Sequence, residues 1–291
     1  MAVKIARYIF RGQEYLLTKN TDTGLYEATI SAPSVSSYSQ ANHKFGGQII
    51  AEDTAGNTAT VDEKGDSNLL LRVMERVAPV ISVTYPTASA LITNSTPTIK
   101  WKVTDNDSGV ASSSLSVDGK AVTSGIVKTA ITGGYEYLYT PTTALADGKH
   151  TISIGASDND GNAASAKSVS FTVDTVPPTL NVTAPTNGLA TNKASVTVVG
   201  NTDDATSKPV TITVNGQAAT VNTDGTFSKE LTLSEGSNTI TVIAKDRAGK
   251  TTTVIRKVIL DTVAPVIHTA KITPNPVDCG ATFIISVQID D

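Results

Sequence analysis

The sequence predicts an all-β protein in which β-sandwich modules follow one another along the chain. Its composition is 39% hydrophobic but only 5% aromatic and 17% charged, a balance that favours short strands with polar turns over helices. A motif in three parts also recurs along the chain, and a repeat of this kind indicates a modular architecture. Proline-containing segments separate the copies, so we expect short linkers between the modules.

Each copy of the repeat contains an x-G-[QK] turn, a G-x-[YF] strand start and an A-x-D-x-x-G-[NK] hairpin. The copies read YIFRGQEYLL…TGLYEATI…IIAEDTAGNTATV, LSVDGKAV…GGYEYLYT…ISIGASDNDGNAAS and ITVNGQAAT…DGTFSKELT…TVIAKDRAGKTTTV. Two further strands precede the second and third copies, whereas the first copy opens directly at its RGQ turn. The segment after Val266 resembles those two strands.

The module boundaries read RVAPVISVTYPT, DTVPPTLNVTAPT and DTVAPVIHTAKITPNP. Proline fixes its own φ and restricts the preceding residue to extended conformations, so each boundary predicts a short, stiff linker. The spacing of Pro79, Pro178 and Pro265 suits sandwich modules of about 100 residues. The predicted organisation is a module over 1–77 that lacks its first two strands, sandwiches over 78–175 and 176–263, and a two-strand segment over 264–291.

The third module shows the expected strands most clearly. TLNVTAPT is the first strand, and ASVTVVGN is the second, with Val196, Val198 and Gly200 on one face by alternation. VTITVNGQAATV predicts a hairpin that turns at Asn215-Gly216, because this dipeptide suits the positive φ angles of a tight turn. GTFSKELTL, NTITVIAKD and TTTVIRKVILD complete the set. Seven strands with turns every 8 to 12 residues predict an immunoglobulin-like sandwich, and the second module repeats this pattern.

Two aromatic residues of the second module, Trp101 and Tyr137, could either contact a ligand or pack in the core. Trp101 alternates with Lys100 and Lys102, which predicts an inward side chain that packs in the core rather than one that stacks on a sugar. Tyr137 sits where the third copy has Lys229, so it is the candidate ligand-facing aromatic.

The recurrent D-x-x-G-[NK] turn has two interpretations. The Asp side chain can accept hydrogen bonds from the following backbone N–H groups while Gly adopts a left-handed conformation. Alternatively, such loops can supply the oxygen atoms that calcium needs. The turn recurs even where acidic residues are few, as in DRAGK, so turn chemistry is the favoured interpretation.

Calcium is the candidate cofactor, and no other cofactor is expected. In an immunoglobulin-like sandwich the loops after the second and sixth strands lie at the end where the first strand enters. In the second module this predicts that Asp105, Asp107, Asp158 and Asp160 converge as metal ligands. The third-module equivalents are Asp203, Asp204 and Asp246, near Asp174.

Several classes of function are not expected. His43, His150 and His268 are far apart in sequence and lack partners at ligand spacing, and surface positions were expected for the first two. No nucleophile elbow, P-loop or H-E-x-x-H motif is present, so no catalytic residue is predicted. The net charge of −4 and the lack of a basic cluster argue against nucleic acid. No apolar run approaches 18 residues, so no membrane span is expected, and the single Cys279 forms no intrachain disulfide.

The segments DTVPPTLNVTAPT, NGQAATV, DGTFSKELTLSEGSNTITVIAKDRAGK and DTVAPV carry a family resemblance. Through them, the second and third modules resemble bacterial Ig-like domains, the third being similar to the type found beside carbohydrate-active and cell-surface proteins. The segments TGLYEATISAPS and ITPNPVDCGATFIISVQIDD, in a chain whose start lacks a secretory signal pattern, resemble Ig-like proteins of bacteriophage or prophage tail regions.

That resemblance implies a non-enzymatic virion structural protein of a tail or baseplate, made in the host cytoplasm and acting as a spacer or decoration outside the cell. Its partners would be other virion proteins or copies of itself. The alternative is a carbohydrate-binding adhesin that contacts the bacterial host surface, and a third hypothesis is an accessory module of an enzyme. Fold alone does not choose among these functions.

The out-of-phase repeat also predicts an assembly interface. Phe283, Ile285, Val287 and Ile289 alternate with polar residues and would insert into a partner sheet by strand complementation. An equally weighted alternative is that the first module is a smaller, self-sufficient sandwich. Met1–Tyr8 and Asn68–Val73 would then form its edges, and the C-terminal segment would be a loose hairpin.

Overall fold

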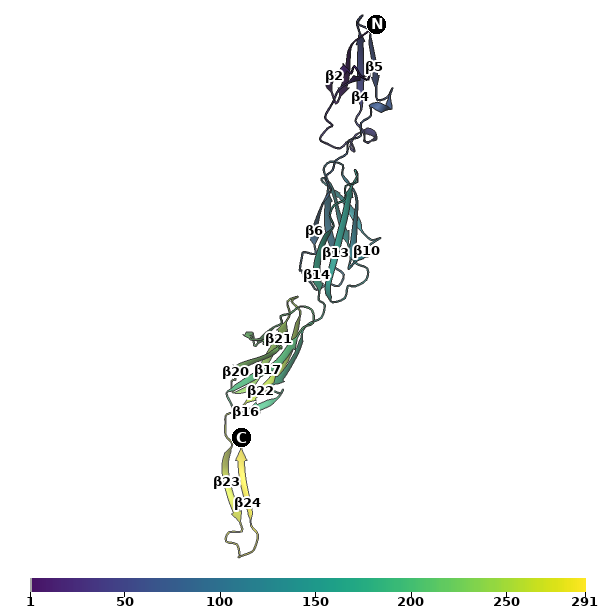
Figure 1. Ribbon diagram of the computed structural model, residues 1–291. Helices are drawn as coiled ribbons and strands as arrows, with labels where there is room; N and C mark the ends of the chain where they lie inside the picture. The colour runs from purple at the N-terminus through teal and green to yellow at the C-terminus, as the bar shows by residue number, and fades with distance from the viewer. Residues whose placement is uncertain (1) are drawn as a thin grey trace. The chain divides into compact units, whose positions relative to one another are not determined.

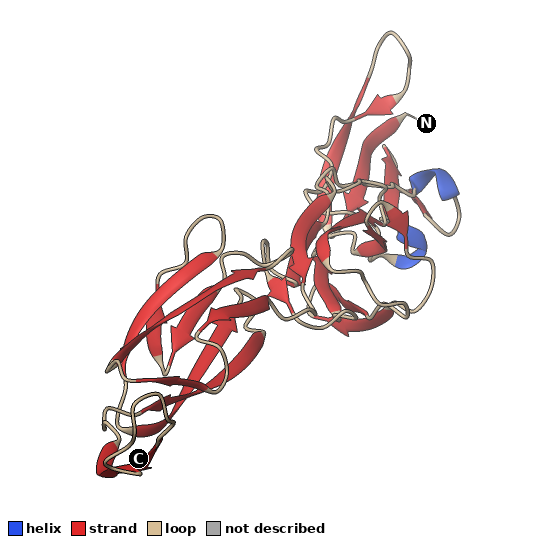
Figure 2. Ribbon diagram, turned by 90° about the horizontal axis from the view of Figure 1, so that it is seen from below, coloured by secondary structure: helices blue, strands red, loops and turns tan. Residues whose placement is uncertain are grey.

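The computed structural model describes residues 2–291, and almost all of its regular structure is β-strand (Figures 1 and 2). The all-β prediction is confirmed. The chain divides into two compact units, one containing the residues up to Ala90 together with Ser95–Thr172, the other containing Leu91–Asn94 and Val173–Asp291. Among the described residues, no helix is long and apolar enough to cross a membrane.

The first unit begins with a five-stranded antiparallel sheet, here called the N-terminal sheet. Its strand order is β3-β2-β1-β4-β5. The strands are β1 (Val3–Phe10), β2 (Gln13–Lys19), β3 (Tyr26–Glu27), β4 (Gly47–Asp53) and β5 (Thr58–Asp62), with 3₁₀ turns η1 (Ala41–His43) and η2 (Ser67–Leu69) in the connections.

One face of the N-terminal sheet carries alternating apolar residues of β1, namely Ala6, Tyr8 and Phe10. The ring of Phe45 packs edge-on against Phe10 with centroids 6.0 Å apart. No second sheet covers this face within residues 2–77. The alternative of a small self-sufficient sandwich with Met1–Tyr8 and Asn68–Val73 as its edges is therefore wrong. β1 lies in the middle of the sheet rather than at an edge, and Leu71 contributes only an isolated bridge to Phe45.

The second module contains two packed sheets, with strand orders β10-β9-β13-β14-β7 and β11-β12-β8-β6. The first comprises β7 (Leu91–Ile92), β9 (Val110–Val117), β10 (Lys120–Ala121), β13 (Gly148–Asp158) and β14 (Lys167–Val173). The second comprises β6 (Val80–Tyr85), β8 (Ile99–Thr104), β11 (Val127–Ile131) and β12 (Gly134–Tyr139).

Trp101 lies at the centre of the second module's core. Its side chain is 0% exposed, as predicted, and its indole N–H donates to Ser113 Oγ at 3.0 Å. The register of β12 against β8 pairs Tyr137 with Trp101, and the two rings stack with centroids 5.2 Å apart. Tyr137 is only 4% exposed, so its interpretation as a ligand-facing aromatic is wrong: the cross-strand partner draws it into the core.

The third module belongs to the second unit and also has two sheets. One has the order β15-β17-β20 and contains β15 (Thr179–Ala184), β17 (Ser195–Asp203) and β20 (Thr226–Thr232). The other has the order β16-β22-β21-β18-β19. It contains β16 (Leu189–Thr191), β18 (Thr211–Val214), β19 (Gln217–Ala219), β21 (Gly236–Lys245) and β22 (Thr251–Leu260).

Two sequence features of the third module act as predicted. Asn215 and Gly216 both have positive φ, at 46° and 78°, and they turn the hairpin between β18 and β19. Gly200 faces the core beside Phe227, where a Cβ would come within 2.3 Å of the Asn181 carbonyl oxygen. Only glycine therefore allows β15 and Phe227 to approach β17 this closely.

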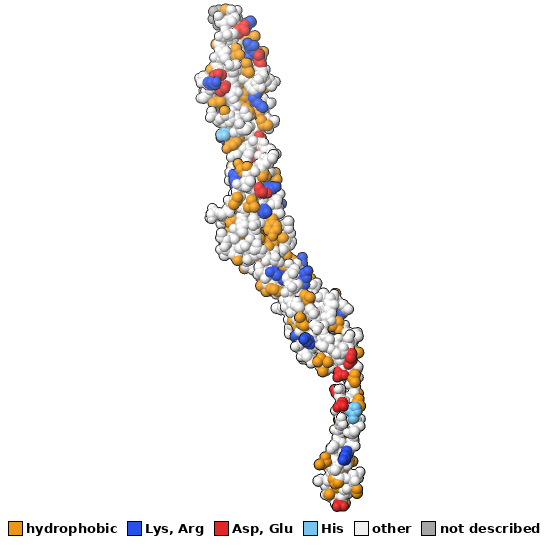
Figure 3. All heavy atoms as spheres, turned by 180° about the vertical axis from the view of Figure 1, so that it is seen from behind, with side chains coloured by type: hydrophobic (Ala, Val, Ile, Leu, Met, Phe, Trp, Pro, Cys, Tyr) orange, Lys and Arg blue, Asp and Glu red, His pale blue; other side chains and the backbone are white. Residues whose placement is uncertain are grey.

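The chain continues into a two-stranded hairpin, here called the C-terminal hairpin, formed by β23 (Val266–Thr273) and β24 (Ile284–Asp290). Val266, which follows a boundary proline, pairs with Asp290. The equivalent pairs after the other boundary prolines are Val80 with Thr104 and Thr179 with Asp203. The hairpin thus begins with the same pairing as the first two strands of the sandwiches, although its register shifts after two pairs rather than four. Every residue in its strands is exposed (Figure 3).

Phe227 provides a test of the core assignment, because it is 1% exposed in the cluster that joins the two sheets of the third module. We expect Phe227→Ala to lower the free energy of unfolding of this module by about 3–5 kcal/mol, measured by calorimetry on the full chain. Ser228→Ala, at the exposed neighbouring position, should change it by less than about 0.5 kcal/mol. Trp101 fluorescence reports the unfolding of the second module. If Phe227→Ala shifted that transition as much as the transition of the third module, the assignment of Phe227 to a separate core would be contradicted.

Candidate functional site

The loops after β8 and β13 meet at one end of the second module, as predicted. Asn159 joins them, since its backbone N–H donates to Gly109 O at 3.1 Å and its side-chain amide donates to Ser108 O at 2.8 Å. The four aspartates predicted to form a calcium site lie on these loops, but the structure divides them into two pairs with different partners.

Asp107 and Asp160 hold a loop that precedes the second module. The backbone N–H of Ser36 donates to Asp107 Oδ1 at 2.8 Å, and Ser36 Oγ donates to Asp160 Oδ2 at 2.5 Å. Asp160 also accepts from the backbone N–H of Glu75 at 3.1 Å and lies 3.8 Å from the Arg72 guanidinium. These two carboxylates are therefore occupied as acceptors for the N-terminal region, and the predicted ligand set of four is not assembled.

Asp105 and Asp158 instead form a cluster with Glu75, in which a carboxylate oxygen from each lies within 4.8 Å of the others. Burial raises the pKa of Glu75, and the charges of Asp105 and Asp107 raise it further, while hydrogen bonds from Ser108 oppose this. Sequence reasoning missed Glu75. The available signal was its position four residues before Pro79, which is the position of Asp174 relative to Pro178.

Most of the carboxylate oxygens in this cluster have donors. Asp105 Oδ1 accepts from the backbone N–H groups of Asp107 and Gly109 at 3.0 and 2.9 Å. Both oxygens of Asp158 accept from Asn162, one from its backbone at 2.8 Å and the other from its side-chain amide at 2.7 Å. The turn interpretation of the D-x-x-G-N motif therefore describes Asp158 well.

The equivalent cluster in the third module contains Asp174, Asp204 and Asp246, also within 4.8 Å of one another. These residues are 0%, 6% and 5% exposed. Asp203, which the sequence grouped with them, lies outside the cluster. The alternation of β17 turns it to the surface, where it is paired with Lys208 at 2.6 Å.

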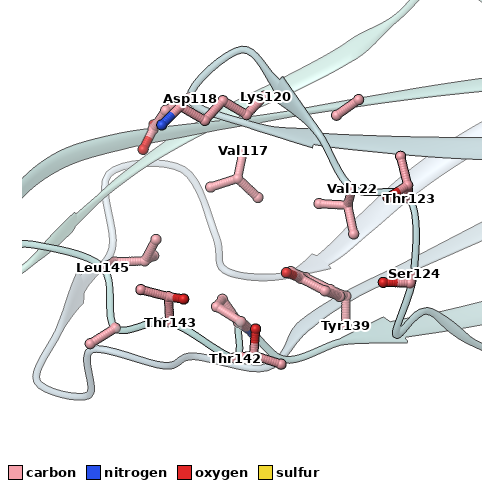
Figure 4. A pocket seen from close by; sticks show the side chains of 13 residues that line it. Val117, Asp118, Lys120, Val122, Thr123, Ser124, Tyr139, Thr142, Thr143 and Leu145 are labelled. Atoms are coloured by element: carbon pink, nitrogen blue, oxygen red, sulfur yellow. The ribbon is translucent and has the colours of Figure 1, made fainter.

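A surface pocket of about 490 Å³ lies beside the turn between β9 and β10 in the second module (Figure 4). Val117, Val122, Tyr139 and Leu145 contribute apolar surface, and several threonine and serine side chains add hydroxyl groups. No histidine, cysteine or pair of acidic residues lines this pocket. It therefore offers a shallow binding surface of mixed polarity rather than an arrangement for acid–base or nucleophilic chemistry.

His150 is buried, at 8% exposed, and not at the surface as expected. Its Nδ1 lies 2.7 Å from Asp118 Oδ2, and its Nε2 lies 2.7 Å from Ala146 O. Both partners are acceptors, so the protonated ring satisfies both bonds. Burial opposes protonation, but the bonds to Asp118 and Ala146 outweigh it and raise the pKa of His150. Burial likewise acts to raise the pKa of Asp118, and the bond from His150 lowers it overall.

The His150–Asp118 pair should make the second module's stability depend on pH. The raised pKa of His150 stabilises the fold below about pH 6.5, and this contribution is lost as pH rises through the folded-state value. The lowered pKa of Asp118 stabilises it above about pH 3.9, and this is lost on acidification. Denaturant unfolding followed by Trp101 fluorescence should therefore show greater stability at pH 5.5 than at pH 8. In His150→Gln this difference should shrink, and an unchanged difference would contradict the assignment.

Comparisons with known proteins agree with this architecture. Residues 79–154 match a family model described as a bacterial Ig domain, and residues 178–262 match glucodextranase domain B. Bacillopeptidase F from Bacillus subtilis (strain 168) is 29% identical over 200 residues, which cover 68% of this chain and 13% of that protein. The chain thus spans a small part of that relative.

Solved structures that match this chain include fibronectin(III)-like modules of Clostridium thermocellum CbhA, at 19% identity and a TM-score of 0.38, covering 62% of this chain and 94% of that one. An I-band fragment of titin matches at 12% identity and a TM-score of 0.42, covering 89% and 88% of the two chains. None of these matches is to a phage tail protein. The family models confirm the predicted fold class, an all-β array of tandem immunoglobulin-like sandwiches with bacterial Ig-like domains.

Proposed function

We propose that this chain is a non-catalytic structural spacer that joins other components through the apolar faces of its N-terminal sheet and C-terminal hairpin. The observation that carries the proposal is that the acidic loops after β8 and β13, at one end of the second module, bind the preceding segment of the chain rather than lying open to a ligand. In immunoglobulin-like folds such loops often bind ligands. Here Asp107 and Asp160 are instead occupied in holding Ser36 and Glu75.

The C-terminal hairpin supplies one exposed face. Counted back from the shared first pair, Phe283, Ile285 and Val287 correspond to Val196, Val198 and Gly200 of the third module. The latter three point into a closed core or pack against it. Phe283, Ile285, Val287 and Ile289 are 51%, 60%, 46% and 56% exposed. The predicted interface residues therefore occupy positions that a complete sandwich buries.

The N-terminal sheet offers the complementary layer. Its order β5-β4-β1-β2 parallels β22-β21-β18-β19 in the third module. Ile49 pairs with Val61 in the same way that Val242 pairs with Val254. In the third module this layer packs against β15 and β17. We therefore assign the C-terminal hairpin of a second copy as the occupant of the N-terminal sheet.

Removal of the hairpin tests this assembly. The full chain should form concentration-dependent oligomers in sedimentation or light-scattering measurements, and deletion of residues 266–291 should abolish them. The paired change Ile285→Asp and Val287→Asp should have the same effect because it places charges in the buried layer. The matched control is Ser286→Asp with Gln288→Asp, on the opposite face of β24. A full chain that stays monomeric, or a deletion that still assembles, would exclude this interface.

The setting in which the spacer works is a separate question. A phage tail or baseplate remains the prediction made from sequence resemblance. The similarity to Bacillopeptidase F over 200 residues favours a second candidate, an accessory array of a peptidase. A carbohydrate adhesin has less support, because the exposed aromatic residues among the described large apolar side chains are Tyr85 and Phe283, in separate units.

Fractionation of producing cells distinguishes these settings. A virion component should co-sediment with tail particles in a density gradient, and it should appear in the mass spectra of purified particles. An accessory array should instead co-purify with a peptidase. Binding of the purified chain to host cell-wall glycans, absent for a Tyr85→Ala variant, would instead favour the adhesin and count against a pure spacer.

A further inference from the structure

The third module buries three carboxylates together without a positive partner. Asp174, Asp204 and Asp246 are each at least nine-tenths buried, and among residues 2–291 no lysine or arginine forms a salt bridge with them. Burial of several like charges is costly unless a counter-charge is present. A cation bound at the cluster would supply the missing counter-charge.

The hydrogen bonds of the cluster leave two oxygens free. Thr206 and Ser207 donate to Asp204 Oδ1 from the backbone at 2.8 and 2.6 Å, and Lys250 donates to Asp246 Oδ1 at 2.8 Å. The second oxygens of Asp174 and Asp246 are fully buried and have no hydrogen-bond partner. Such unpartnered buried oxygens are rare in folded proteins and call for a missing partner.

A single substitution within the repeat explains the free oxygen of Asp246. In the N-terminal sheet and the second module, the last residue of the D-x-x-G-[NK] motif is an asparagine whose amide donates to the second aspartate oxygen. The distances are 2.8 Å from Asn57 to Asp53 and 2.7 Å from Asn162 to Asp158. The third module has Lys250 at this position, and its backbone alone bonds to Asp246.

We propose that Asp174, Asp204 and Asp246 bind one calcium ion. The carboxylate oxygens lie within 4.8 Å of one another, which is the spacing of oxygens that share one calcium ion at about 2.4 Å. The acidic cluster contains no histidine or cysteine, so its chemistry suits a hard cation better than zinc. The ion would tie the segment before β15 to the loops after β17 and β21. This proposal does not depend on the proposed spacer function.

Calorimetry on the full chain tests the site. After treatment with EDTA and buffer exchange, titration with calcium chloride should show binding that is lost in Asp246→Asn. Saturation at 100 times the dissociation constant should raise the melting temperature of the third module by about 10–20 °C. Magnesium, which prefers a smaller octahedral site, should bind more weakly. Equal affinity for magnesium would overturn the assignment to calcium.

Three variants separate a metal site from a purely structural cluster. In EDTA, Asp246→Asn should melt at a higher temperature than the wild type because one like charge is removed, yet it should not respond to calcium. Lys250→Asn should weaken calcium binding by about tenfold, because the new amide occupies the free oxygen. Asp203→Asn, at the exposed neighbouring position, should bind calcium as the wild type does.

Two further results would overturn the proposal. The first is an Asp246→Asn variant that is destabilised in EDTA and retains the calcium response, since this would leave the carboxylates with hydrogen bonding as their only role. The second is calcium binding that survives in Asp246→Asn but is lost in Glu75→Gln, which would place the ion at the cluster of the second module.

Discussion

The need to cover one apolar face of every sheet is the constraint on which the rest of this structure depends. The third module meets it internally, because Val198 and Phe227 of one sheet share a core with Ile212 and Val242 of the other. The second module does so around Trp101. The N-terminal sheet and the C-terminal hairpin have the same alternation of apolar residues without a second layer among the described residues. The two differ in exposure, because Ala6 and Phe10 of the N-terminal sheet are buried, whereas every strand residue of the C-terminal hairpin is exposed.

The D-x-x-G-[NK] turn shows how one motif acquires different roles. In each copy the first oxygen of the aspartate accepts the backbone N–H of the motif's last residue, which fixes the turn. What the second oxygen does depends on the side chain of that last residue. Asparagine satisfies it in the first two copies, whereas Lys250 leaves it free in the third. The first oxygen thus serves the turn in every copy, and the side chain of the motif's last residue decides whether the second oxygen is free for the proposed cation.

The acidic loops of the second and third modules also differ in the partners of their carboxylates. Asp105 and Asp204 occupy equivalent positions, and Glu75 and Asp174 each stand four residues before a boundary proline. In the second module, the nearby Asp107 and Asp160 are occupied by Ser36. Among the described residues, no equivalent hydrogen bond from a preceding module reaches the loop of the third module, and its three carboxylates lie within 4.8 Å of one another.

The sequence by itself determined the strands, the turns and the inward faces, because these depend on local rules. Alternation placed Trp101 and Val198 inside, and the Asn215-Gly216 dipeptide specified its turn. The tertiary structure alone decided the roles of Tyr137 and Glu75. Tyr137 is buried because the register of β12 against β8 sets it opposite Trp101. Glu75 joins Asp105 and Asp158 because the fold brings together residues distant in the chain. Contacts between distant segments set these environments, and no local pattern encodes them.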